Sequence, residues 1–205
     1  MYRLYSIPGS CSTGIHVLLN KLGKAVEIVN RDDVPDYAKK VPTNQVPALE
    51  DGNELLTEGA AIALYLMEKH GVAPLPGKET QEFRQWLLFN YSTLHATYSK
   101  LFMVGVHSAP EDVQSRTALI SHVAERLSTL WQIVETHLEG REFVVGDSPT
   151  VIDYLLAIYA NWGNSVPEAK IFIGPNTRRL IETVIQLPEF TQAIEREGIE
   201  YRMAA

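Results

Sequence analysis

A segment rich in proline and glycine divides the 205-residue chain into two stretches with different hydrophobic patterns. Residues 71–78 hold two prolines and two glycines, which rarely continue a helix or a strand. Before this segment, short strand patterns alternate with helix patterns, whereas every periodic pattern after it is helical. We therefore expect an α/β domain at residues 1–72, a linker at 73–80 and an all-α domain at 81–205.

The first stretch predicts the element order β-α-β-(α)-β-β-α. Residues 51–53 (Asp-Gly-Asn) separate two strand patterns, and glycine and asparagine tolerate the positive φ of a tight hairpin turn. Gly23 ends the first helix pattern, and the polar segment 32–40, which carries Pro35, predicts a loop with one helical turn. The expected strands are residues 2–6, 25–29, 46–50 and 54–56, and the expected helices are residues 15–22 and 57–70.

The second stretch predicts helices alone. Its apolar residues recur at helical spacing, and Pro110 stands where one of the helices begins. Thr150 and Asp153 form the pattern of a capping box, in which two side chains satisfy free amides at a helix start. The expected helices are residues 81–107, 110–138, 150–162, 175–186 and 188–197.

Composition and charge exclude several classes of function. The net charge of −7 argues against a nucleic-acid partner and against an anionic membrane surface. The longest apolar run, residues 60–67, is too short to span a bilayer, and the first residues predict a strand rather than a signal peptide. A single cysteine excludes an intramolecular disulfide, so we expect a cytoplasmic protein. The histidines form no His-x-x-x-His pair and no Gly-x-Gly-x-x-Gly follows the first strand, so neither a metal nor a dinucleotide is expected.

The single cysteine lies in the turn between the first strand and the first helix. Free amides and the positive end of the helix point at such a position, and this field favours a thiolate. Lowering the pKa of a thiol from about 8.5 would make Cys11 a nucleophile at neutral pH. The same spacing also fits a buried, inert Cys11 with Ser10 as an ordinary helix N-cap. Spacing alone leaves both interpretations open.

Three segments of the first stretch resemble the N-terminal motifs of bacterial, beta-class glutathione S-transferases. They are residues 5–12 (YSIPGSCS) followed by His16, residues 41–49 (VPTNQVPAL) and residues 57–62 (TEGAAI). The motifs stand in the family's order, and the resemblance extends over essentially the whole chain. It implies a thioredoxin-like N-terminal domain followed by an all-α helical bundle, and a homodimer that uses glutathione as co-substrate without a metal.

The resemblance also implies where glutathione would bind. It makes the Val46–Pro47 bond cis, with the backbone of Val46 paired to the glutathione peptide, and it places Glu58 and Gly59 at the γ-glutamyl end. Much of the family carries serine where this chain has Gly59 and lysine where it has Ala96, so one wall of the site is expected to differ. The implied residues are catalytic Cys11, Ser12 and His95; glutathione-binding Ser10, Gln45, Val46, Pro47, Glu58 and Gly59; and, in an electrophile pocket, Tyr5, Tyr98, Phe102 and Trp162.

Three hypotheses about function follow from this resemblance. The leading one is conjugation of the glutathione thiolate to small hydrophobic electrophiles, a detoxifying reaction driven by a lowered thiol pKa and by positioning. A second makes Cys11 the nucleophile of a thiol–disulfide exchange or peroxidase reaction with glutathione. A third is a non-catalytic ligand-binding protein of the same fold, for which the residues at positions 59 and 96 leave room.

Overall fold

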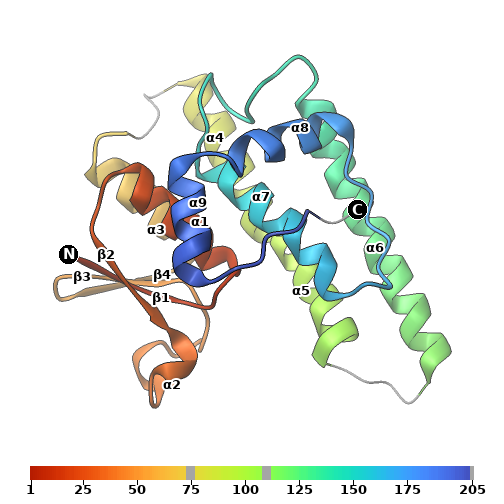
Figure 1. Cartoon of the computed structure of the whole chain (residues 1–205), viewed down its shortest axis with the longest axis horizontal. Helices are drawn as coiled ribbons and strands as arrows, with labels where there is room; N and C mark the ends of the chain where they lie inside the picture. The colour runs from red at the N-terminus through yellow and green to blue at the C-terminus, as the bar shows by residue number, and fades with distance from the viewer. Residues whose placement is uncertain (73–76, 108–111, 204–205) are drawn as a thin grey trace.

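The computed structural model describes residues 1–72, 77–107 and 112–203, apart from the side chain of Lys78. Within the first range, four strands form one sheet in the order β2-β1-β3-β4 (Figure 1). Strand β1 runs parallel to β2 and antiparallel to β3, which pairs with β4 in a hairpin. The elements are β1 (Tyr2–Ser6), α1 (Cys11–Lys21), β2 (Val26–Asn30), α2 (Tyr37–Lys40), β3 (Ala48–Asp51), β4 (Glu54–Thr57) and α3 (Gly59–Lys69).

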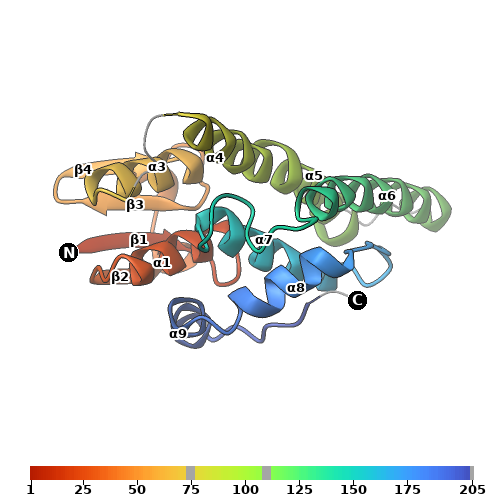
Figure 2. The ribbon, with the colours of Figure 1, turned by 90° about the horizontal axis from the view of Figure 1, so that it is seen from above.

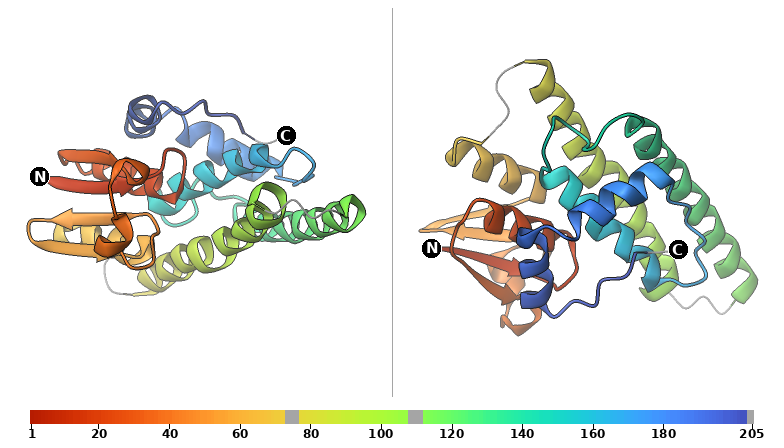
Figure 3. Two further views of the ribbon diagram at one scale, coloured as in Figure 1. Left: turned by 90° about the horizontal axis from the view of Figure 1, so that it is seen from below. Right: turned by 45° about the horizontal axis from the view of Figure 1, so that its top comes forward.

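The rest of the described chain is helical; most of its helices stack beside the sheet, whereas the last one lies against α1 (Figures 1 and 3). The long helix expected at 81–107 is one continuous run that changes its winding, because two π-helical segments, Phe89–His95 and Met103–His107, follow the α-helical parts. The α-helices are α4 (Lys78–Leu88), α5 (Ala96–Phe102), α6 (Val113–His137), α7 (Val151–Trp162), α8 (Pro175–Val184) and α9 (Pro188–Glu197).

Helix α7 lies at the centre of the molecule and joins the two parts. Its residues are buried on nearly every side, which is the pattern of a helix enclosed by others. Helix α1 packs between the sheet and both α7 and α9 (Figure 2). A Cβ atom on Gly14 of α1 would lie 2.7 Å from Cδ2 of Leu155 on α7, so glycine is required for this close approach.

The capping box predicted at residues 150–153 is confirmed. The side chain of Thr150 accepts from the Ile152 amide, and Asp153 accepts from the Thr150 amide at 2.7 Å. Asp153 also accepts from the amide of Val144 at 3.0 Å, which ties the preceding loop to α7. Burial raises the pKa of Asp153 to about 6 despite these hydrogen bonds. Desolvation of the Asp153 carboxylate therefore opposes part of the stabilisation that the capping box provides.

The predicted elements match the observed ones, with differences at their ends. Strands and helices of the first stretch begin and end within a few residues of their expected bounds, as is usual when ends depend on local hydrogen bonding. The expected start of a helix at Pro110 lies outside the described residues, as does half of the expected linker. The division into domains at 1–72 and 81–205 stays a prediction. In the part of the chain that is described, no helix is both long and apolar enough to cross a membrane.

Candidate active site

A cleft of about 1000 Å³ opens between the loops at one end of the sheet and the helical bundle. The turn before α1 forms the floor of the cleft. The loop before β3 and the start of α3 form one side, and the π-helical region and the end of α7 form the other. The lining residues are 7–11, Arg31, Thr43, 45–47, 57–60, Leu88, Tyr91, Ser92, His95, Ala96, Ser99, Phe102, Val106, Asn161, Trp162, Ser165, Gly198 and Ile199. The cleft thus brings together most of the predicted site residues.

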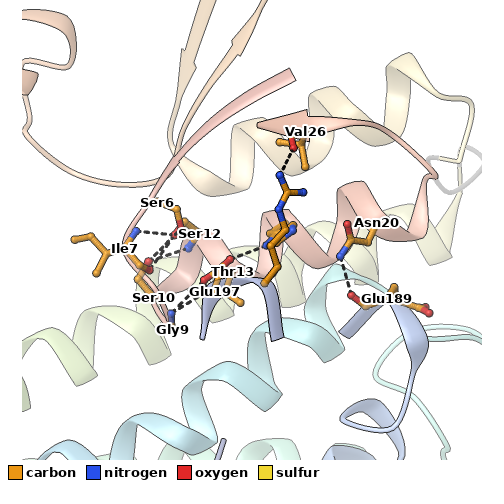
Figure 4. Close-up of polar contacts among 12 residues, drawn as sticks. Ser6, Ile7, Gly9, Ser10, Ser12, Thr13, Asn20, Val26, Glu189 and Glu197 are labelled. Atoms are coloured by element: carbon orange, nitrogen blue, oxygen red, sulfur yellow. Dashed lines mark hydrogen bonds and ion pairs between the residues drawn. The ribbon is translucent and has the colours of Figure 1, made fainter. Parts of the chain in front are cut away.

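The turn before α1 is held by a chain of serine hydroxyls. Ser10 is the N-cap of α1, and its side chain accepts from the amide of Ser12 at 3.3 Å. The hydroxyl of Ser12 lies 2.6 Å from the hydroxyls of both Ser6 and Ser10 (Figure 4). Ser12 is therefore fully buried and does not line the cleft. The prediction that Ser12 is catalytic is corrected to a role in shaping the turn.

The last helix reaches back and holds the same turn. The Glu197 carboxylate on α9 accepts from the amide of Gly9 at 3.3 Å and from the Thr13 hydroxyl at 2.7 Å (Figure 4). It also lies 2.7 Å from Nδ1 of His16, and both of these side chains are almost wholly buried. From the other side, the indole of Trp162 donates to the carbonyl of Gly9 at 2.7 Å. The position of the turn is thus fixed by residues between 153 and 188 positions away.

Cys11 lies at the floor of the cleft, with 3% of its surface exposed. Its thiol donates to the carbonyl of Val46 at 3.6 Å. Burial raises the pKa of Cys11 to about 12, and the negative charge of Glu58 adds to this, whereas the amides at the helix start lower it less. Of the two interpretations that the spacing left open, the buried thiol agrees with the free protein, because desolvation outweighs the helix field.

Alkylation of Cys11 by iodoacetamide should show this raised pKa directly. Far below the pKa of a thiol, the thiolate fraction rises about tenfold per pH unit, so the rate should keep climbing from about pH 7 to pH 10. Mass spectrometry of the quenched protein measures the rate, and the urea-unfolded chain is the control, whose rate should level off above about pH 9. A plateau near neutral pH in the folded protein would contradict the assignment.

The loop before β3 has the backbone geometry that the resemblance implies. The Val46–Pro47 bond is cis, which confirms that prediction. The carbonyl of Gln45 accepts from the hydroxyl of Tyr37 at 3.0 Å, which fixes the loop, while the exposed side chain of Gln45 points into the cleft lining. Within the described residues, the amide of Val46 has no hydrogen-bond acceptor. The amide of Val46 is thus free, while the preceding carbonyl of Gln45 is already hydrogen-bonded. An extended peptide can pair with such a free backbone edge.

Glu58 and Gly59 stand at the start of α3. Glu58 adopts φ 66° and ψ 106°, a conformation that is costly for a residue with a side chain and is concentrated at functional sites. Its exposed carboxylate makes no capping bond to α3. Among the described residues, the amides of Gly59 and Ala60 have no acceptor either. Free amides at a helix start, next to a free carboxylate, suit a zwitterionic group that carries both a carboxylate and an ammonium.

Aromatic rings form the opposite wall. The ring of His95 lies 5.0 Å from that of Trp162 and is stacked on Tyr159 at 5.7 Å, and Phe102 lies 5.5 Å from Trp162. Burial lowers the pKa of His95, which keeps the imidazole neutral at pH 7. Tyr159 lies behind this wall, fully buried and outside the cleft lining. These rings therefore give the wall an apolar surface beside one neutral imidazole.

Two residues predicted for the electrophile pocket lie elsewhere. Tyr98 is fully buried in the core, where its hydroxyl accepts from the indole of Trp131 at 3.0 Å. Tyr5 is turned toward the other face of the sheet, where its hydroxyl donates to Glu50 at 2.9 Å. The prediction is corrected for both, because each polar tip has a partner that draws the ring away from the cleft.

The cleft also holds residues that the motifs did not indicate, above all Tyr91 and Arg31. Tyr91 reaches the cleft because the π-helical turn shifts it relative to an ideal α-helix, and hydrophobic spacing does not report such a shift. Arg31 is brought there by the short turn after β2, where it donates to the carbonyl of Asn44 at 3.2 Å.

Known proteins resemble this chain in sequence. Residues 1–68 match the model of the glutathione S-transferase N-terminal domain. The chain is 29% identical to glutathione S-transferase GST-4.5 of Xanthomonas campestris over 79% of this chain and 82% of that protein. It is 28% identical to glutathione S-transferase GstA of Escherichia coli O157:H7 over 97% of this chain and all of that protein.

The fold agrees with solved structures over the same length. A sphingomonad glutathione S-transferase, described as complexed with glutathione, is 26% identical and superposes with a TM-score of 0.78 over 97% of this chain and all of that chain. A glutathione S-transferase of Xylella fastidiosa, at 23% identity, superposes with a TM-score of 0.85 over 98% of this chain and all of that chain. The thioredoxin-like domain followed by helices is thus the fold of the whole described chain.

Proposed function

The chain belongs to the glutathione S-transferase family, and on this premise we propose that it transfers the thiolate of glutathione to small hydrophobic electrophiles. The observation that carries the proposal is the two-sided cleft. One side offers free backbone amides and the Glu58 carboxylate to a peptide, while the other offers the rings of His95, Phe102 and Trp162 to an apolar molecule. A thiol held on the floor would meet both.

The peptide of glutathione would lie along the polar side. Its cysteinyl unit would pair with Val46, and its γ-glutamyl ammonium and carboxylate would contact Glu58 and the first amides of α3. Gln45 and Arg31 line the end of the cleft where the glycine carboxylate would then fall. This placement leaves the sulfur of glutathione next to Cys11.

Cys11 would act as a hydrogen-bond donor to the thiolate of glutathione. Its raised pKa keeps the Cys11 thiol protonated, and a protonated thiol stabilises a neighbouring anion by donating to it instead of to Val46. We assign the role of accepting the proton that leaves glutathione to neutral His95, which lines the cleft. The thiolate then attacks the electrophile held against the aromatic wall, and the leaving group departs into the open side of the cleft.

The same pKa supports conjugation over the exchange hypothesis. A nucleophilic Cys11 would need to be ionised at neutral pH, and burial opposes this. The resemblance additionally supports a detoxifying role, a homodimer and a cytoplasmic location for this protein.

The test combines binding with turnover. We expect the protein to be retained on a glutathione affinity column and to conjugate glutathione to a chloronitroarene. The variant Cys11→Ala should keep part of the conjugation activity, because the amides and His95 remain. Absence of both retention and turnover in a folded sample would remove the proposal. Loss of all activity in Cys11→Ala, together with an added glutathionyl mass on Cys11 in the parent, would favour exchange.

A further inference from the structure

The hydroxyl of Tyr91, in the cleft region, has no role in the proposed conjugation reaction. The oxygen of Tyr91 is buried, and the described residues offer it no hydrogen-bond partner. A buried hydroxyl without a partner is destabilising, so its presence at a ligand cleft points to a partner that arrives with the ligand. The ring of Tyr91 lines the cleft, within the π-helical segment that also carries His95.

The position of this oxygen is set by Gly59. A Cβ atom on Gly59 would lie only 2.4 Å from the hydroxyl oxygen of Tyr91 and 2.4 Å from its Cε1 atom. No side chain fits at position 59 while the tyrosine is in place. The tyrosine oxygen therefore occupies the space that a short hydroxyl side chain at position 59 would fill.

Position 59 is also the first residue of α3, an 11-residue helix. The amides of Gly59 and Ala60 lack acceptors among the described residues, and the positive end of the helix favours an anion beside them. A carboxylate bound to these amides would lie within reach of the Tyr91 hydroxyl. Burial keeps the pKa of Tyr91 well above its ordinary value, so the group is a proton donor throughout the neutral range.

We propose that the Tyr91 hydroxyl donates a hydrogen bond to the γ-glutamyl carboxylate of bound glutathione, and so supplies from the helical bundle the hydroxyl that position 59 lacks. The proposal rests on glutathione being the ligand of the cleft. Tyr91 is then a glutathione-binding residue that connects the two walls of the cleft. Its backbone is part of the helical bundle, and its hydroxyl oxygen lies next to the start of α3.

The first experiment removes the hydroxyl alone. Tyr91→Phe should weaken glutathione binding by about tenfold in calorimetry, the usual loss for a hydrogen bond to a charged group. S-methylglutathione should lose affinity by the same factor, because it keeps the carboxylate and has no thiol. Tyr159→Phe, which removes a buried hydroxyl outside the cleft lining, is the matched control and should bind as the parent does.

The outcomes of this experiment separate the possible failures. Unchanged binding in Tyr91→Phe overturns the proposal. A loss seen with glutathione but absent with S-methylglutathione also overturns it, since the hydroxyl would then serve the sulfur. No glutathione binding by the parent protein would instead refute the proposed function on which this inference rests.

The second experiment moves the hydroxyl back to position 59. Gly59→Ser should bind poorly because its Cβ atom collides with the tyrosine ring, and Tyr91→Ala should bind poorly because the hydroxyl is gone. The double variant has room for the serine and a hydroxyl at the same place, so its affinity should return to within about threefold of the parent. Purely additive losses, measured on samples with matching thermal unfolding, would refute the exchange of one hydroxyl for the other.

Discussion

Replacing Glu197 by alanine is expected to destabilise the protein by about 3 kcal/mol or more, since three donors lose one acceptor and an unsatisfied buried group costs roughly 1–3 kcal/mol. The donors are the amide of Gly9, the hydroxyl of Thr13 and Nδ1 of His16. Urea unfolding measures the loss. Because Gly9 belongs to the turn that leads into Cys11, the variant should also alkylate faster at Cys11 than the parent at the same pH.

The matched control is Glu195→Ala. Glu195 lies on the exposed side of the same helix and has no side-chain partner among the described residues, so its removal should change stability by less than about 0.5 kcal/mol. If Glu197→Ala unfolds at the same urea concentration as Glu195→Ala, the carboxylate does not hold the turn. A stability loss without faster alkylation would show that the contacts of Glu197 stabilise the fold but do not affect the environment of the Cys11 thiol.

The second large effect is expected at the other end of the glutathione site. Glu58→Gln keeps the shape of the side chain and removes its charge, so the ammonium of glutathione should bind about 10–100-fold more weakly, the range for a hydrogen bond between charged groups. Calorimetry at one ionic strength measures the change. Since the negative charge of Glu58 contributes to the raised pKa of Cys11, the same variant should alkylate somewhat faster in the absence of ligand.

A ligand without the amino group identifies the contact. The analogue in which glutaryl replaces γ-glutamyl should bind the parent and Glu58→Gln with equal affinity, because it offers no ammonium to either. Glu54→Gln, which removes an exposed carboxylate from β4, controls for net charge. Equal losses with glutathione and with the analogue would show that Glu58 acts through the local backbone rather than on the ammonium.

The architecture was predictable because its signals are local. Alternating and helical hydrophobic patterns, turn residues and the capping box at 150–153 each depend on neighbours within a few residues. They predicted the strands, the helices and their order along the chain. The residues of the cleft that come from contiguous motifs, such as Val46, Pro47 and Glu58, were predictable from the resemblance for the same reason.

The features of the site that the sequence did not predict depend on contacts between segments far apart in the chain. The turn at Cys11 has the features that lower a thiol pKa, yet in the fold the thiol is buried and bonded to Val46, 35 residues away, and burial raises its pKa. Tyr98 and Phe102 share a helix one turn apart, but only Phe102 lines the cleft, while Tyr98 is buried with its hydroxyl bonded to Trp131 on α6. The hydrogen bonds of Glu197 connect residues 181 or more positions apart. Local sequence patterns do not predict contacts over such a separation.

The contact between α9 and the first turn has a consequence for the order of events on the ribosome. Synthesis proceeds from the N-terminus, and the sheet with its first helices is complete long before residue 197 emerges. During that interval, the amide of Gly9 and the imidazole of His16 have no Glu197 to bind, and the nascent thiol turn lacks its final support. The final geometry at the reactive end of the cleft therefore requires that residue 197 has been translated.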